Sequence, residues 1–183
     1  MSVKIGVMQP YLFPYKGYFD LIASVDKFVV YDDAKYMKGK YINKNWFPER
    51  FTFRLEKHSD YAKINECYFK NLQEDIISFN NKTKLNAEKY FKLMQPSYNL
   101  SYNITLTLQA ICKDLGINTE FYMSSTIPHG KFVQGILDIV HTLNGDTYVN
   151  LPGGKKLYNQ EMFGNIKLEF IETKPAPSIL CEI

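Results

Sequence analysis

The stretch MQPYLFPYKGYFDLI, Met8 to Ile22, decides how this chain can fold. The residues just before it, Val3–Gln9, form a short apolar run ended by Pro10, which predicts a buried strand. The last residues of the quoted stretch begin a second segment, Gly17–Val25, whose apolar residues have helical spacing. The connection between strand and helix is rich in Tyr, Phe and Pro, whereas such loops are usually built from small polar residues. An aromatic loop at this position therefore needs a structural or functional reason.

The rest of the chain continues the alternation of strands and helices. Lys27–Tyr31 predicts a second strand, so the first forty residues indicate strand, helix, strand with a connection long enough for a parallel crossover. Further strands are predicted at Asn118–Met123, at TYVNL (residues 147–151) and at Ile166–Ile171. The segment after Pro128 is predicted to form a helix. The expected fold class is therefore α/β with a parallel sheet. Its core strands are expected near Ile5, Phe28, Phe121 and Tyr148.

The middle of the chain has a different pattern. Tyr41–Glu56 and Ala62–Phe69 alternate polar and apolar residues, which predicts antiparallel or edge strands. Lys70–Gly116 is mostly helical in pattern, with an interruption at Pro96. Since 183 residues suffice for one core, we expect a single domain over residues 1–183 with a hairpin-plus-helices insertion at about 36–116.

Composition narrows the function classes. A formal net charge of +3 is too small to indicate a nucleic-acid partner. Cys67, Cys112 and Cys181 lie far apart without CxxC spacing, and the three histidines are scattered, so the sequence predicts neither a disulfide framework nor a metal site. No leader pattern or long apolar run is present, which predicts a cytoplasmic protein without a membrane span. No motif identifies a cofactor.

The first candidate group lies in and after the aromatic loop. A glycine in the first turn of a helix lets a ligand approach free backbone N–H groups, and tyrosines supply walls and hydroxyls. The candidate substrate-binding residues are Gln9, Tyr11, Tyr15, Gly17 and Tyr18. The alternative is a rigid packed cover over the sheet edge, which we prefer for Phe13 and Phe19. Both interpretations stay open for Tyr15 and Tyr18.

The second group follows the second strand. Asp32 and Asp33 can act as a general base, although adjacent side chains of an extended strand point to opposite faces. They are followed by further polar and basic residues: Tyr36, Lys38, Lys40, Tyr41, Asn43, Lys44 and Asn45. A solvated hairpin with an Asx-type turn is the plainer interpretation. Stacking on single-stranded nucleic acid is disfavoured because the two carboxylates lie inside the basic patch.

The third group is a glycine pair followed by lysines after the strand TYVNL. Gly153, Gly154 and Lys155 bring backbone amides next to cations, as in an anion-holding nest. The spacing is not that of a Walker motif. A tight turn explains the same composition equally well. No GxSxG motif marks a nucleophilic serine.

Three motifs together carry a family resemblance. MQPYLFPYKGYFDLI, DKFVVYDDAKYMKGKYINKNWF and LNGDTYVNLPGGKKLYN resemble the WbqC-like protein family of bacteria. The resemblance implies a place in gene clusters for O-antigen and other surface polysaccharides, and a glycine-type aminoacyl transfer. Family members usually read INRN where this chain has Lys44, so a bidentate arginine contact is replaced by an ammonium. Residues 177–180 resemble a shortened form of the pattern with which the family ends.

The resemblance and the residues lead to one functional hypothesis. We expect a transferase that attaches an aminoacyl or acyl group to an amino sugar, a small-molecule substrate carried on a nucleotide or a lipid. Asp32 or Asp33 is the expected general base. Tyr36 and Lys38 would orient the donor or stabilise developing negative charge. Asn43, Asn45 and the glycine–lysine group complete the expected substrate-binding set.

A second likeness suggests an alternative function. Residues 15–18 have the spacing of the HxGH motif of nucleotidyltransferases, with tyrosine in place of both histidines. This likeness implies that the α/β fold is a Rossmann-like parallel sheet of the HUP or nucleotidyltransferase-like kind, with a hairpin-plus-helices insertion. A neutral phenol cannot supply the positive charge of an imidazolium, which counts against ordinary adenylyl transfer. Nucleotidyl transfer with this degenerate motif, or non-catalytic binding of a sugar nucleotide, are the alternatives.

Overall fold

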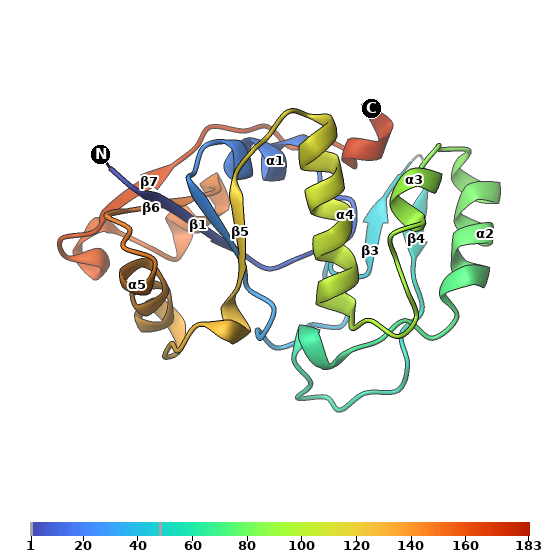
Figure 1. Ribbon diagram of the computed structural model, residues 1–183, viewed down its shortest axis with the longest axis horizontal. Coiled ribbons are helices and arrows are strands. Elements are labelled where there is room, and N and C mark those ends of the chain that lie inside the picture. Colours follow the sequence, from blue (N-terminus) through green and yellow to red (C-terminus); the bar gives the residue numbers. More distant parts are fainter. Residues whose placement is uncertain (1, 48) are drawn as a thin grey trace. The chain divides into compact units, whose positions relative to one another are not determined.

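The computed structural model describes residues 2–47 and 49–183 (Figure 1). Backbone contacts divide them into two compact units. Unit 1 comprises residues 2–8, 17–31 and 117–175, and unit 2 comprises residues 9–16, 32–116 except residue 48, and 176–183. The expected insertion at residues 36–116 lies within unit 2.

Unit 1 is built on a five-stranded parallel sheet with the strand order β5-β2-β1-β6-β7. Its strands are β1 (Lys4–Met8), β2 (Lys27–Val30), β5 (Glu120–Met123), β6 (Thr147–Asn150) and β7 (Lys167–Phe170). All four pairings are parallel, with β1 at the centre between β2 and β6. The α/β prediction and its four core strands are confirmed. The order is consistent with a Rossmann-like arrangement, in which the chain runs outward from β1 in both directions.

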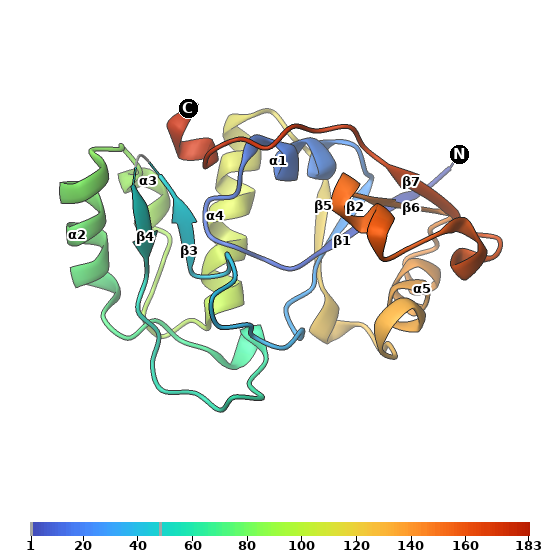
Figure 2. The same ribbon diagram turned by 180° about the vertical axis from the view of Figure 1, so that it is seen from behind.

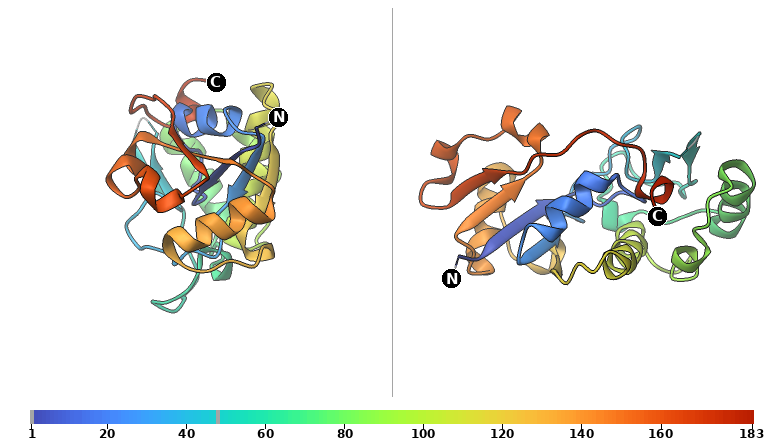
Figure 3. Two further views of the ribbon diagram at one scale, coloured as in Figure 1. Left: turned by 90° about the vertical axis from the view of Figure 1, so that its left-hand side faces the viewer. Right: turned by 90° about the horizontal axis from the view of Figure 1, so that it is seen from above.

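Helices cover both faces of this sheet (Figure 3). On one face lies α1 (Lys16–Ala23), where the Tyr18 ring packs against Phe28 of β2 with centroids 5.6 Å apart. The next residue, Val29, points to the opposite face because strand side chains alternate. There it joins the core beneath α5 (Phe132–Thr142). Short 3₁₀ helices complete unit 1: η2 (Ser124–Thr126), η3 (Pro152–Lys156) and η4 (Gln160–Phe163).

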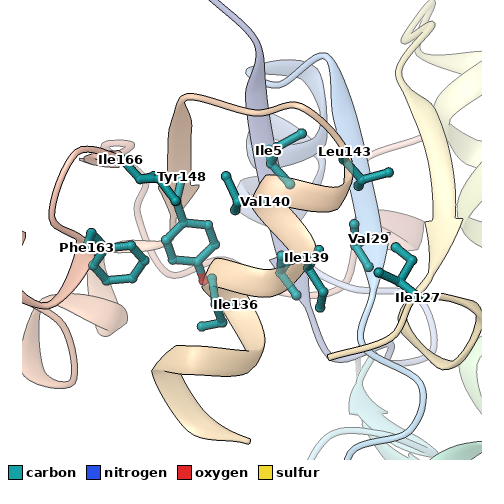
Figure 4. Packing of buried hydrophobic residues seen from close by; sticks show 11 residues of the cluster. Ile5, Val29, Ile127, Ile136, Ile139, Val140, Leu143, Tyr148, Phe163 and Ile166 are labelled. Carbon is teal, nitrogen blue, oxygen red and sulfur yellow. The ribbon is translucent and has the colours of Figure 1, made fainter. Parts of the chain in front are cut away.

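The core beneath α5 combines aliphatic and aromatic side chains (Figure 4). Ile139 and Val140 of α5 are completely buried against Ile5 of β1. The rings of Tyr148 and Phe163 stack with an interplanar angle of 10° and centroids 5.2 Å apart. The loop before β6 runs so close to β1 that a Cβ on Gly145 would lie 2.4 Å from Ile5 Cγ1. Only glycine fits there without displacing the core.

Unit 2 combines a small hairpin with helices (Figure 2). Its elements are β3 (Lys44–Trp46), β4 (Arg50–Thr52), η1 (Ile64–Glu66), α2 (Leu72–Thr83), α3 (Glu88–Phe91), α4 (Leu100–Asp114) and η5 (Ile179–Cys181). β3 and β4 are antiparallel, as expected for part of Tyr41–Glu56. The helical prediction for Lys70–Gly116 is also confirmed, since Pro96 separates α3 from α4.

The strand prediction for Ala62–Phe69 is wrong. This segment forms η1 and makes only isolated bridges, among them Leu55 with Phe69. The Glu66 side chain accepts a hydrogen bond from the Lys63 backbone N–H at 2.9 Å, which closes the turn. Local bonding of this kind gives the backbone an alternative to a sheet ladder, although the alternating burial resembles that of a strand.

The three thiols have different surroundings, which predicts their reactivity. All are free; burial raises the pKa of Cys67 to about 11 and that of Cys112 to about 12, whereas Cys181 is exposed. Because the thiolate is the reactive form, we expect a single thiol to react with a disulfide reagent at pH 8 in the native protein, and three in denaturant. Cys181→Ser should abolish the native reaction. Rapid native reaction of two or three thiols would contradict the burial of Cys67 and Cys112.

Among the described residues, none of the helices combines the length and apolar character needed to cross a bilayer.

Candidate functional site

The aromatic loop, residues 9–15, forms part of the core of unit 2. Phe13 is completely buried and has a left-handed backbone, φ 50°. Its ring lies 5.5 Å from that of Phe91 and 6.4 Å from that of Phe79. The interpretation of Phe13 as a core residue is confirmed, as is that of Phe19, which is buried in unit 1. Packing is thus the structural reason for aromatic residues in this loop.

Hydrogen bonds from distant residues hold the loop in this conformation. The Phe13 carbonyl accepts from Asn45 Nδ2 at 2.6 Å and from Ser178 Oγ at 2.7 Å. The Ile179 N–H donates to the Pro14 carbonyl at 2.8 Å. A left-handed conformation is costly for a bulky residue and persists only where its surroundings determine it, as these bonds do.

The remaining residues of the first group differ in exposure. Gln9 is exposed, and Tyr11 and Tyr15 are half-buried. The Tyr11 hydroxyl accepts a hydrogen bond from the Tyr15 N–H at 3.2 Å, and burial raises the pKa of Tyr11, which keeps the phenol neutral. In unit 1, Gly17 and Tyr18 are buried in α1. Their assignment to substrate binding stays a prediction.

The second group contains two carboxylates with different partners. Asp32 is 2% exposed, and its Oδ2 accepts from Asn65 Nδ2 at 3.1 Å. The Asn65 N–H also donates to the Asp32 carbonyl at 3.0 Å, so η1 fixes both the main chain and the side chain of Asp32. Asp33 lies 3.7 Å from Lys63 Nζ. The two acids therefore have separate environments, consistent with at most one of them facing a given site.

The other members of this group also divide by burial. Tyr36 is nearly buried and donates to Asn43 Oδ1 at 2.8 Å, and Asn43 Nδ2 donates to the Phe53 carbonyl at 2.6 Å. Burial raises the pKa of Tyr36. Lys38 is exposed. Asn43 and Asn45 thus both bind neighbouring backbone carbonyls, so the amides position the hairpin.

The glycine–lysine group lies in unit 1, directly after β6. In open α/β sheets, ligands bind beyond the carboxyl ends of the strands at the point where the strand order reverses, which here lies between β1 and β6. Gly154 is buried in η3, and a Cβ there would lie 2.6 Å from Asn150 Nδ2. Its N–H already donates to the Leu151 carbonyl at 2.9 Å, as in a tight turn. Gly153 borders open space, and Lys155 Nζ lies 5.8 Å from the centre of the Phe170 ring.

Comparison with known proteins identifies the family. The family model described as the WbqC-like protein family matches residues 9–178. The chain belongs to the WbqC-like protein family. It is also 25% identical over 184 residues to "Uncharacterized protein Rv1507c" of Mycobacterium tuberculosis, a match covering 90% of this chain and 79% of that protein. No solved structure matches the chain.

Some residues that shape the candidate site of this WbqC-like protein escaped sequence reasoning. Lys63 and Asn65 hold the acidic pair, and Ser178 holds the aromatic loop. Asn65 is 33 positions from Asp32, and Ser178 is 165 positions from Phe13. No motif marks Lys63 or Asn65. For Ser178 the available signal was the resemblance of residues 177–180 to the pattern with which the family ends.

Proposed function

We propose that this WbqC-like protein is a transferase of bacterial surface polysaccharide biosynthesis. It attaches an aminoacyl group of the glycine type, or another acyl group, to an amino sugar carried on a nucleotide or a lipid. The observation that carries the proposal is the Asp32 carboxylate, which is buried and oriented by Asn65. An oriented and largely desolvated carboxylate beside a second acid is suited to general base catalysis. Membership of the WbqC-like family supports the biosynthetic setting, because the resemblance implies a place in gene clusters for surface polysaccharides.

The proposed step forms an amide bond. The amine of the sugar attacks the carbonyl carbon of an activated donor, an ester or thioester, and Asp32 or Asp33 accepts the proton that the amine loses. The bond to the donor's alcohol or thiol breaks, and that group leaves with the proton that the carboxyl group gives back, which restores the carboxylate. Lys38 is the better candidate for stabilising the oxyanion, because the Tyr36 hydroxyl already donates to Asn43.

The test compares isosteric amide variants. Asp32→Asn with Asp33→Asn should lower the turnover of acyl or aminoacyl donors with an amino sugar by about 10²-fold or more, the usual contribution of a general base. Mass spectrometry of the sugar product measures the transfer. Asp60→Asn removes an exposed carboxylate from unit 2 and serves as the matched control. Full turnover by the double variant would remove both acids from the mechanism.

The sheet order of unit 1 favours a second candidate, nucleotidyl transfer, because this arrangement is common in nucleotide-binding proteins. That function predicts release of pyrophosphate from a nucleoside triphosphate in the presence of Mg²⁺. Assaying the same preparations for pyrophosphate separates the two reactions. Binding of sugar nucleotides without either product would indicate a non-catalytic protein.

A further inference from the structure

A pocket of about 240 Å³ lies at the hairpin of unit 2. It is lined by Gly39, Tyr41, Lys44, Asn45, Trp46 and Arg50. Lys44 is only 9% exposed. Within residues 2–47 and 49–183, no carboxylate forms an ion pair with Lys44 or Arg50, and the lining contains no acidic residue. The pocket therefore has two positive charges and no compensating negative charge.

The hairpin register places these cations together. Trp46 is opposite Arg50 and Asn45 is opposite Phe51. Since strand side chains alternate, Lys44, Trp46 and Arg50 share one face of the hairpin. Asn45 and Phe51 point the other way, where Asn45 binds the aromatic loop and Phe51 packs on Phe79, with centroids 5.4 Å apart. One face of the hairpin is thus core, and the other holds the pocket.

The surroundings of Lys44 disfavour its positive charge. A largely buried lysine side chain usually has an acidic partner, and Lys44 has none among residues 2–47 and 49–183. Burial lowers the pKa of Lys44, and the nearby charge of Arg50 lowers it further. Both effects oppose the charged form, and the attraction of an anion in the pocket would offset them. The arrangement is that of a site for a negatively charged group.

The aromatic residues narrow the ligand class. Tyr41 and Trp46 are each about half exposed, and both line the pocket with the cations. Exposed aromatic faces bind sugar rings and nucleobases by apolar contact and stacking. The volume is below the 300–1,000 Å³ typical of whole drug-sized ligands, so the pocket accommodates a phosphate-bearing part of a larger molecule.

We propose that this pocket binds the diphosphate of a sugar diphosphate, with Lys44 and Arg50 on the phosphate oxygens and Trp46 and Tyr41 against the adjoining ring. Nucleotide-linked and lipid-linked sugars both contain a sugar diphosphate, and they differ only in whether the second phosphate carries a nucleoside or a lipid. For this choice of ligand the inference rests on the proposed transferase.

Calorimetric titration without any acyl donor tests binding separately from turnover. We expect UDP and a UDP-linked amino sugar to bind in a 1:1 ratio, uridine to bind at least tenfold more weakly, and added salt to weaken the binding of UDP. Lys44→Met and Arg50→Gln should each weaken UDP binding at least tenfold. Lys57→Met, which removes an exposed lysine of unit 2, should not. A second titration uses a polyprenyl-diphosphate sugar in detergent. Binding of this compound but not of UDP or the UDP-linked sugar would show that the natural ligand is lipid-linked.

A stability measurement guards against misfolded variants. Without ligand, Lys44→Met should unfold at the same or a higher denaturant concentration than the wild type, because it removes a positive charge beside Arg50 that no acidic residue among those described balances. Undiminished UDP binding by a folded Lys44→Met protein would overturn the proposal. Failure of the wild type to bind either the UDP compounds or the polyprenyl-diphosphate sugar would also overturn it. If the wild type binds UDP, Lys44→Met does not, and no acyl transfer is detected, the diphosphate site would be supported and the proposed transferase function would be rejected.

Discussion

Phe79→Ala is expected to lower the free energy of unfolding of unit 2 by about 3–5 kcal/mol, the usual cost of truncating a buried phenylalanine. Phe79 lies in α2 and is completely buried. Its ring lies 4.6 Å from that of Phe47 and 5.2 Å from that of Phe91, centroid to centroid. It also contacts rings of the aromatic loop and of β4: Phe13 and Phe51. The truncation therefore leaves a cavity where the hairpin, the helices and the loop meet.

Denaturant unfolding followed by tryptophan fluorescence measures this loss. Trp46 is the single tryptophan of the chain and lies in β3, so its emission reports on the hairpin of unit 2. Ile77→Ala is the matched control, because Ile77 is on the same helix and 62% exposed. The control should shift the transition by less than about 0.5 kcal/mol. Equal effects of the two variants would contradict the packing around Phe79.

The architecture of unit 1 could be predicted because its signals are local. Each strand is a short apolar run, and each crossover helix has an apolar face that shows in the sequence. Neighbouring residues such as Phe28 and Val29 serve opposite faces of one sheet, as strand geometry requires. Parallel pairing then follows from the connection lengths.

The assembly of unit 2 depends on contacts that leave no local signal. Asn45 and Ser178 are far apart in the chain, yet both donate a hydrogen bond to the Phe13 carbonyl. The alternation in Ala62–Phe69 resembled that of a strand, but a turn satisfies the backbone there. Nor does the sequence show that Lys44 is largely buried and has no acidic partner among the described residues. Replacement of the family's usual arginine suggested a weaker contact, whereas in the fold Lys44 lines a pocket together with Arg50.

Asn45→Ala is expected to lower the free energy of unfolding by about 1–3 kcal/mol, the usual cost of leaving one polar group without its partner. That group is the Trp46 N–H, since the Phe13 carbonyl keeps its bond from Ser178. Asn45 is 7% exposed. Its Nδ2 donates to the Phe13 carbonyl at 2.6 Å, and its Oδ1 accepts from the Trp46 N–H at 2.8 Å. Truncation removes both bonds and loosens the strained turn at Phe13.

A double-mutant cycle with Ser178→Ala separates this supporting role from ligand binding. Both side chains donate to the same carbonyl, so their effects on stability should be coupled by about 0.5–3 kcal/mol. Truncating either one leaves the other to satisfy Phe13, whereas the double variant leaves the carbonyl with neither. The double variant should therefore lose more stability than the sum of the losses in the two single variants. Additive losses would show that the two bonds act independently. An unchanged stability of Asn45→Ala, with weakened binding of UDP, would support the predicted place of Asn45 in the substrate-binding set.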